Sequence, residues 1–231
     1  MTRVVIKNIY MTLITIVNQI FRFKRLKSNH IAILMTFPED VMPIIEQLNQ
    51  KGYELTVIAK EKEWAKLKQF KNVSFVPAGN SHIVRHIKTI STAKVIVIDT
   101  YYLMLGGYHK KKGQTIIQTW HASGALKNFG LTDHQVDLNN KKMIQQYKSV
   151  YNATDYYLVG GEEMSRCFES AFDAKSTQML KLGLPRLTKY FKLDLKTEQK
   201  NLKKYLCLYV IKIFPLVCVC GKEFSTPKIP G

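Results

Sequence analysis

The strongest constraint in this sequence is the alternation of short, uniformly apolar runs with segments of helical periodicity. The runs at residues 30–36 (HIAILMT), 53–59 (YELTVIA) and 94–99 (KVIVID) are rich in β-branched residues and have the length of buried strands. Helical segments of about 8–16 residues separate such strands, and crossovers of this kind join parallel neighbours with a right-handed connection. The sequence therefore predicts an α/β fold: a doubly wound, Rossmann-like domain over residues 29–195.

In a sheet of this kind ligands bind beyond the carboxyl ends of the strands, and the most distinctive stretch of the sequence falls there. It follows a strand expected at residues 114–120 and contains Trp120, His121, Ser123, Gly124 and Lys127. An imidazole at such an edge can act as a general base at neutral pH, because its ordinary pKa is about 6.5. The small residues let backbone amides approach an anion, at a point where the next helix is expected to begin. The alternative is a loop histidine that caps or packs.

Three other features are expected at the same edge. Asp99 ends its own strand and can hold a ribose, a hydroxyl or a histidine, or simply cap. Gly160 and Gly161 lie between a strand and a helix but lack the spacing of a nucleotide-binding loop. Arg186 follows a sharp turn, where it can meet a phosphate or only complete the turn. These four residues are candidates for substrate binding.

The net charge of +18 implies a polyanionic partner or a lysine-rich solvated surface. Nucleic acid, anionic lipid and a phosphorylated substrate all fit that charge. Nucleic acid is disfavoured, because basic and aromatic residues do not interleave as in the known binding modules. The four cysteines lack the paired spacing of a zinc site, so no metal is expected.

Residues 1–28 predict a basic, amphipathic helix. Its apolar stretch is short and is interrupted by Thr and Asn, so a spanning helix is not expected. A helix with this composition suits an anionic membrane surface, and the alternative is a helix packed on its own domain. The basic residues expected to meet the membrane are Arg22, Lys24, Arg25 and Lys27.

Residues 196–231 differ from the rest of the chain. From Tyr205 to Cys220 the only charged residue is Lys212, and a tail containing Pro and Gly follows. The run suits a pair of core strands, a short membrane segment or the product of a shifted reading frame.

Four stretches together resemble the CDP-glycerol glycerophosphotransferases of wall teichoic acid synthesis, most closely the members that add the first glycerol phosphate. They are residues 99–102 (DTYY), 118–130 (QTWHASGALKNFG), 157–161 (YLVGG) and 182–186 (LGLPR). The resemblance implies a GT-B transferase that moves glycerol phosphate from CDP-glycerol to a polyprenyl-diphosphate-linked disaccharide. It implies no cofactor or metal, a peripheral location on the cytoplasmic face of the membrane, and His121 as the base that deprotonates the acceptor hydroxyl.

The resemblance covers residues 1–204 and departs from the family beyond them. Members of the family continue into a second domain that supplies most of the CDP-glycerol site, and here the chain turns into the apolar tail. We therefore expect an acceptor-side half of a transferase, inactive by itself. The alternative is a stand-alone membrane-surface protein that binds an anionic lipid-linked ligand or a partner enzyme without catalysis.

Overall fold

The computed structural model describes residues 2–191, 194, 197 and 199–203. The described chain divides after Thr188 into two compact units, and the sheet and helices α1 to α6 belong to the first. Of the expected apolar tail at residues 196–231, the part from residue 204 onward lies outside the described residues.

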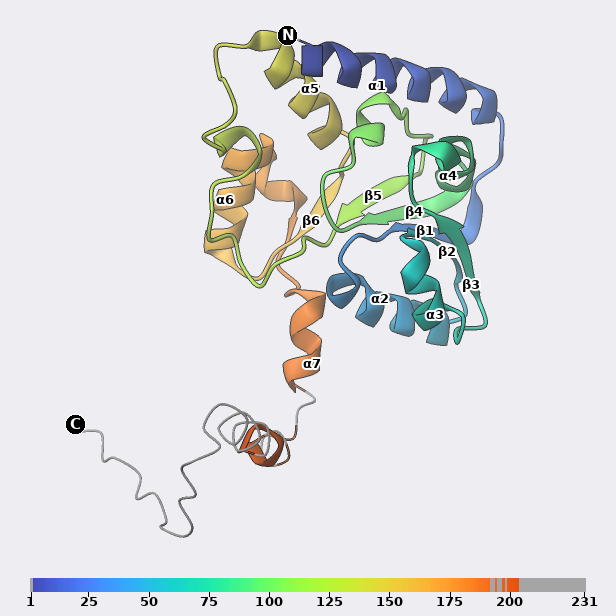
Figure 1. Ribbon diagram of the computed structural model, residues 1–231, viewed down its shortest axis with the longest axis vertical. Coiled ribbons are helices and arrows are strands. Elements are labelled where there is room, and N and C mark those ends of the chain that lie inside the picture. Colours follow the sequence, from blue (N-terminus) through green and yellow to red (C-terminus); the bar gives the residue numbers. More distant parts are fainter. Residues whose placement is uncertain (1, 192–193, 195–196, 198, 204–231) are drawn as a thin grey trace, which may run out of the picture. The chain divides into compact units, whose positions relative to one another are not determined.

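The first unit is built on a seven-stranded, all-parallel sheet in the order β3-β2-β1-β4-β5-β6-β7 (Figure 1). The α/β fold class expected from the sequence is confirmed. The strands are β1 Lys27–Leu34, β2 Glu54–Ala59, β3 Val73–Pro77, β4 Ala93–Ile98, β5 Thr115–Gln118, β6 Tyr156–Leu158 and β7 Met179–Leu180. The helices are α1 Thr2–Phe21, α2 Pro38–Gln50, α3 Trp64–Leu67, α4 Ile83–Ile90, α5 Lys141–Tyr151, α6 Glu162–Phe172 and α7 Thr188–Phe191.

Helices cover both faces of the sheet, as the apolar strands require. Alternate residues of β1 enter different cores: Ala32 and Leu34 pack toward α1, α4 and α5, whereas Ile31 and Ile33 pack toward α2 and α3. Figure 1 shows these two groups of helices on opposite sides of the strands. A third, aromatic core lies under α6 at the β6–β7 end of the sheet. Burial on both faces explains why the central part of these strands is a nearly continuous apolar run, such as Ile31–Leu34 of β1 and Val95–Ile98 of β4.

One local expectation is wrong. The stretch after β5 does not begin a helix: residues 119–129 form an irregular loop before a short 3-10 turn at Gly130–Thr132. The next helix, α5, begins only at Lys141, where Asn140 caps its start by accepting a hydrogen bond from the backbone N–H of Met143.

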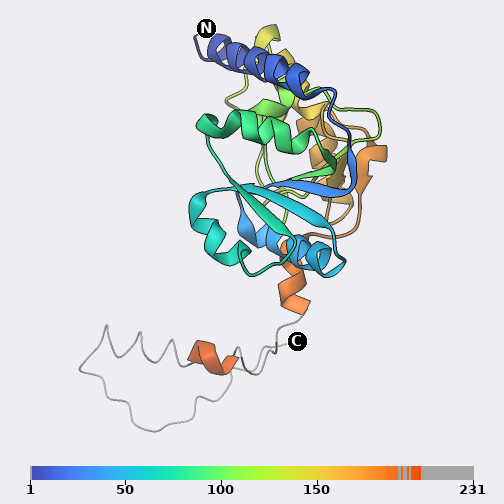
Figure 2. The same cartoon turned by 90° about the vertical axis from the view of Figure 1, so that its right-hand side faces the viewer.

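Helix α1 packs on the domain through one face and leaves the other face exposed. Ile14 and Asn18 are buried, and the Asn18 amide oxygen accepts a hydrogen bond of 3.1 Å from the backbone N–H of His109. Gly107 lies so close to the helix that an added Cβ would be 2.2 Å from the Met11 carbonyl oxygen, so only glycine fits there. Figure 2 shows α1 running alongside α4.

The outward face of α1 is apolar. Its exposed apolar residues are Val5, Ile6, Ile9, Leu13, Ile16 and Ile20, of which Ile20 is 67% exposed, and the polar residues Asn8, Thr12 and Gln19 are exposed beside them. The segment Val4–Phe21, with a mean hydropathy of 1.5, is long and apolar enough to cross a membrane by length and composition, against the expectation from sequence. The helix ends at Phe21, and Lys27 already belongs to β1, where its ammonium pairs with Glu54 at 2.9 Å.

Two buried histidines predict acid sensitivity of the fold. His30 contacts the hydroxyls of Thr56 and Thr92, and His86 donates to the Pro77 carbonyl at 2.7 Å. Burial lowers the pKa of both imidazoles below the ordinary value of 6.5. The unfolded chain therefore binds more protons below about pH 6.5, and the free energy of unfolding falls as the pH decreases through that region.

We expect the urea midpoint to be lower at about pH 5.5 than at about pH 7.5. The double variant H30Q/H86Q should reduce that difference, whereas replacing the exposed His134 by Gln should leave it unchanged. Equal midpoints at the two pH values for the unsubstituted chain would contradict this account.

Candidate active site

The loops that follow β1, β4 and β5 meet at Asp99. Its side chain is fully buried, and one carboxylate oxygen accepts hydrogen bonds from the backbone N–H groups of Thr36 and Phe37, both at 2.6 Å. The other oxygen accepts a hydrogen bond of 2.8 Å from the Tyr102 hydroxyl. Burial raises the pKa of Asp99, and these three donors oppose the rise. Asp99 thus holds neighbouring loops together rather than facing a ligand.

His121 is oriented by the backbone of the same aspartate. Its Nδ1 lies 3.0 Å from the Asp99 carbonyl oxygen. A carbonyl can only accept, so Nδ1 carries the proton in the neutral ring and Nε2 keeps its lone pair. The Phe37 ring stacks on the imidazole, with centroids 4.5 Å apart and planes within 13°. This arrangement leaves one nitrogen able to accept a proton at the carboxyl edge of the sheet.

Trp120 turns the chain at this point. Its φ of 68° is in the left-handed region, which is uncommon for a residue other than glycine and is often found at functional sites. The side chain is 8% exposed, packs on Phe129 and Phe168, and donates from Nε1 to the Gly124 carbonyl at 3.1 Å. The structure places this candidate substrate residue in the aromatic core, where it anchors the loop.

Arg186 makes a bidentate ion pair with Asp40 near the first turn of α2. Both nitrogen–oxygen distances are 2.6 Å, and Asp40 is only 1% exposed. The same guanidinium donates from Nη2 to the His121 carbonyl at 2.9 Å. Arg186 therefore restrains the backbone of the histidine through its carbonyl oxygen, and a phosphate contact of Arg186 stays a prediction.

The remaining candidates lie around this centre on exposed backbone. Ser123 and Lys127 are exposed on the loop after His121. Gly160 and Gly161 follow β6, and an added Cβ on Gly161 would meet nothing within 4 Å. The helix that begins there carries Glu162 in its first turn, where Lys181 pairs with it.

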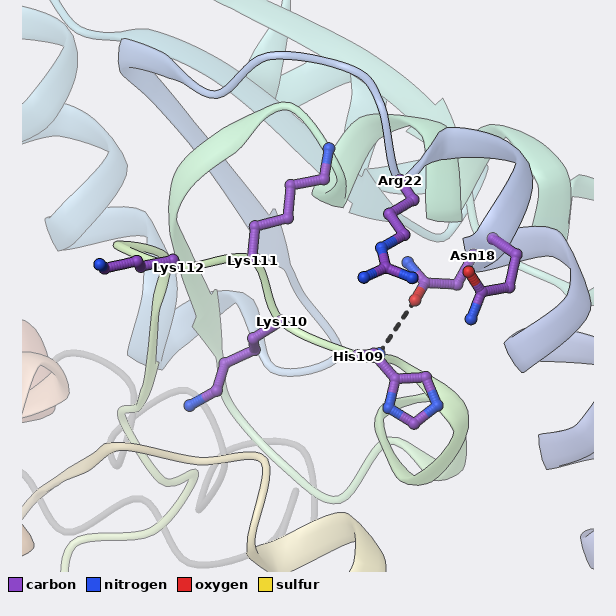
Figure 3. Close-up of a pocket in the computed structure, with 7 residues that line it drawn as sticks. Asn18, Arg22, His109, Lys110, Lys111 and Lys112 are labelled. Carbon is purple, nitrogen blue, oxygen red and sulfur yellow. Dashed lines mark hydrogen bonds between the residues drawn. The ribbon is translucent and has the colours of Figure 1, made fainter.

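The basic residues assigned to a membrane lie elsewhere. Arg22 belongs to the turn after α1 and, with His109 and Lys112, lines an open pocket of about 590 Å³ before β5, at the amino edge of the sheet. Figure 3 shows the Arg22 side chain facing Asn18 and His109, while the lysines of this loop point in different directions. Lys111 is used internally: its ammonium donates to the carbonyls of Phe21, Lys24 and Ser91.

Within the described part of the chain, no group of three or more His, Cys, Asp or Glu side chains is arranged to hold a metal ion. The sequence pattern missed Phe37 and Asp40 as members of the site. Phe37 lies one residue before α2, and Asp40 has the ordinary position of an acid in a first helical turn. Neither position signals a contact with residues 84 and 146 places later.

Known structures define the class of protein to which this fold belongs. The structure of the wall teichoic acid polymerase TagF aligns with a TM-score of 0.61 at 18% identity, covering 84% of this chain and 48% of that one. Its H444N variant aligns with a TM-score of 0.58, covering 94% and 54%. The fold is that of one half of a GT-B-like transferase.

Sequence comparison then gives the family. Residues 16–210 match the family described as CDP-Glycerol:Poly(glycerophosphate) glycerophosphotransferase, and the chain belongs to this family. It is 47% identical to a teichoic acid glycerol-phosphate primase of Staphylococcus aureus (strain NCTC 8325 / PS 47), over 90% of this chain and 58% of that relative. It is 30% identical to a protein of the same name from Bacillus subtilis (strain 168), over 78% and 49%. The chain thus spans about half the length of the curated relatives it matches, and the resemblance inferred from sequence is confirmed.

The Asp40–Arg186 pair predicts a large coupling energy. Removing one partner leaves the other charge buried, so D40N and R186Q should each lower the free energy of unfolding by about 3–5 kcal/mol, and the double variant by less than the sum. The exposed pair Lys148–Asp173, at 2.7 Å, is the matched control and should couple by less than about 1 kcal/mol. Urea unfolding measures both cycles, and additive losses at Asp40 and Arg186 would contradict the assignment.

Proposed function

We propose that this domain supplies the acceptor side of glycerol phosphate transfer from CDP-glycerol to a membrane lipid-linked disaccharide. The observation that carries the proposal is the orientation of His121, with Nδ1 on the Asp99 carbonyl and Nε2 left to accept a proton. The family supports the reaction class and the donor. The acceptor is the lipid-linked disaccharide implied by the family resemblance.

In the proposed step, His121 Nε2 takes the proton of an acceptor hydroxyl as that oxygen attacks the glycerol-bearing phosphorus of CDP-glycerol. A new phosphorus–oxygen bond forms, the bond to the CMP oxygen breaks, and CMP leaves. Phosphoryl transfer depends mainly on positioning and on neutralising charge. Lys127 is exposed on the loop after the histidine and is the nearest candidate along the chain for neutralising the phosphate charge.

The carboxyl edge described here provides a base but few groups for a cytidine nucleotide. We therefore propose that the donor contacts come mainly from the portion of the relatives that this chain does not match, and that this chain alone does not turn over. The binding-only alternative predicts that replacing His121 has no effect or changes only the affinity for the ligand.

A chimera tests the transfer reaction. The matched region of this chain is joined to the remaining C-terminal part of the Staphylococcus aureus relative, and release of CMP from CDP-glycerol is followed with a lipid-linked disaccharide. H121A should lower the turnover by about 10²–10⁴-fold, the usual contribution of a general base. H109A, at an exposed histidine on the other edge of the sheet, is the control. Full activity of the H121A chimera would refute His121 as the general base. Full turnover by the 231-residue chain would refute the proposal that the donor contacts come from the part of the relatives that this chain does not match.

We further propose that the chain docks peripherally on the anionic cytoplasmic face of a membrane through α1. The exposed apolar stripe of α1 points away from the buried face, and Arg22, Lys24 and Arg25 follow its end. Such a helix enters the headgroup region by its apolar face and gains from anionic lipid through its cations. The polar contacts that tie α1 to the domain favour a helix lying on the surface over one that leaves the domain.

Vesicle binding tests the docking surface. I20E should weaken sedimentation of the 231-residue chain with vesicles of phosphatidylglycerol and phosphatidylcholine by about tenfold or more, since burying one Ile contributes about 1.5–3 kcal/mol. L182E is the matched control, because Leu182 is an equally exposed apolar residue outside α1. Equal effects of the two substitutions, or equal binding to vesicles of phosphatidylcholine alone, would exclude this surface.

A further inference from the structure

A small cavity lies beside the proposed base, at the carboxyl edge of β1, β2 and β3. Its volume is about 180 Å³. It is lined from five separate parts of the chain: Tyr10 of α1, Thr36 after β1, Lys60 after β2, Asn80 after β3 and Tyr102 after β4. The strand order places these loops side by side, followed by the loop of His121 after β5. Because these loops and the loop of His121 follow neighbouring strands, the cavity lies on the same edge of the sheet as the histidine.

The polar groups in this cavity have defined hydrogen-bonding capacity. The Tyr102 hydroxyl donates to the Asp99 carboxylate, so its 2.8 Å contact with the Thr36 hydroxyl is one in which Thr36 donates. Thr36 is exposed, and its hydroxyl oxygen can still accept a hydrogen bond from a donor such as a sugar hydroxyl. Because Phe37, the next residue, stacks on His121, this acceptor lies beside the base.

Lys60 supplies the charge. Its side chain is exposed, and its ammonium has no ion pair among the described residues, whereas the neighbouring Lys62 faces Glu63 at 3.8 Å. In the strand order, β2 lies three positions from β5, which separates the ends of these two strands, and so the starts of the loops of Lys60 and His121, by about 14 Å. That separation suits a ligand with a reacting hydroxyl at one end, sugar in the middle and a phosphate group at the other end.

Tyr10 connects this cavity to the helix with the exposed apolar face. It packs against the core from α1, and burial raises the pKa of its hydroxyl. A ligand that leaves the cavity past Tyr10 comes directly to α1. A lipid-linked molecule needs such an exit for its chain, and a free nucleotide does not.

From these observations we propose that the cavity holds the sugar and diphosphate of the lipid-linked acceptor, with Thr36 bonding a sugar hydroxyl and Lys60 the diphosphate. This rests on the proposed function, because it takes His121 as the point where the acceptor hydroxyl is deprotonated. Beyond that function, the proposal assigns the diphosphate to the β2 side of the carboxyl edge and names Thr36 and Lys60 as the residues that select a diphosphate-linked sugar.

Calorimetric titration of the 231-residue chain tests the site. The probe is a short-chain, soluble prenyl diphosphate disaccharide, compared with the same disaccharide lacking the diphosphate. K60Q should weaken binding of the first probe by about tenfold or more, the scale of one charge-assisted hydrogen bond, and leave the second unchanged. K62Q is the matched control and should change neither. T36V, which removes the sugar contact, should weaken both probes.

Four results would overturn the inference: no binding by the unsubstituted chain, no effect of K60Q, equal losses in K60Q and K62Q, or displacement of the probe by CDP-glycerol. Inorganic diphosphate binding as tightly as the disaccharide probe would also overturn it, by showing an anion site without sugar recognition. The chimera reads the transfer reaction separately. If H121A abolishes turnover of the chimera but K60Q does not weaken binding of the probe, the acceptor site is refuted and the reaction stands. If K60Q weakens binding of the probe but the chimera does not turn over, the proposed reaction is refuted and the site stands.

Discussion

The buried carboxylate of Asp99 is the interaction on which the carboxyl edge of the sheet depends. A carboxylate with no exposed surface is stable only if its oxygens are satisfied, and here two backbone amides and one hydroxyl satisfy them. Those donors belong to the loops after β1 and β4. The backbone carbonyl of Asp99 accepts a hydrogen bond from His121 Nδ1 and so determines which ring nitrogen carries the proton. One aspartate thus fixes the loop geometry with its side chain and the imidazole with its backbone.

The loop after β5 is held from both sides against its own backbone preference. Trp120 adopts a left-handed conformation that costs about 1–3 kcal/mol for such a residue. Burial of its indole among Phe129 and Phe168 offsets that cost, and the Arg186 guanidinium, held by Asp40, binds the next carbonyl. The result is a histidine on an irregular loop that is nevertheless restrained at Nδ1 and at its carbonyl oxygen, with its ring stacked on Phe37. Such restraint is what a positioned base requires.

Local pattern was sufficient to predict the sheet, the helices on both faces and the position of His121, because strand and helix periodicity and burial are properties of neighbouring residues. It was insufficient for the roles of Arg186 and Trp120. The partner of Arg186 is 146 residues earlier, and nothing in the sequence around Asp40 distinguishes a buried ion pair from an ordinary acid at a helix start. Trp120 was a candidate for substrate binding, but its indole is buried against Phe129 and Phe168, which are distant from it in sequence or follow it on the loop. A helix was expected after His121 because small residues can begin one, and hydrogen bonds to Trp120 and Arg186 hold that stretch in another form.

The fold holds His121 with Nδ1 protonated and Nε2 available to accept a proton. The most direct test is ¹⁵N–¹H correlation NMR of the ring nitrogens of His121 in the full 231-residue chain, assigned with H121Q, at a pH where the ring is neutral. Free neutral histidine favours the opposite tautomer, with the proton on Nε2, so the measurement is discriminating. The account predicts the Nδ1–H tautomer. A ring with its proton on Nε2, or one that exchanges between the two forms as free histidine does, would contradict it.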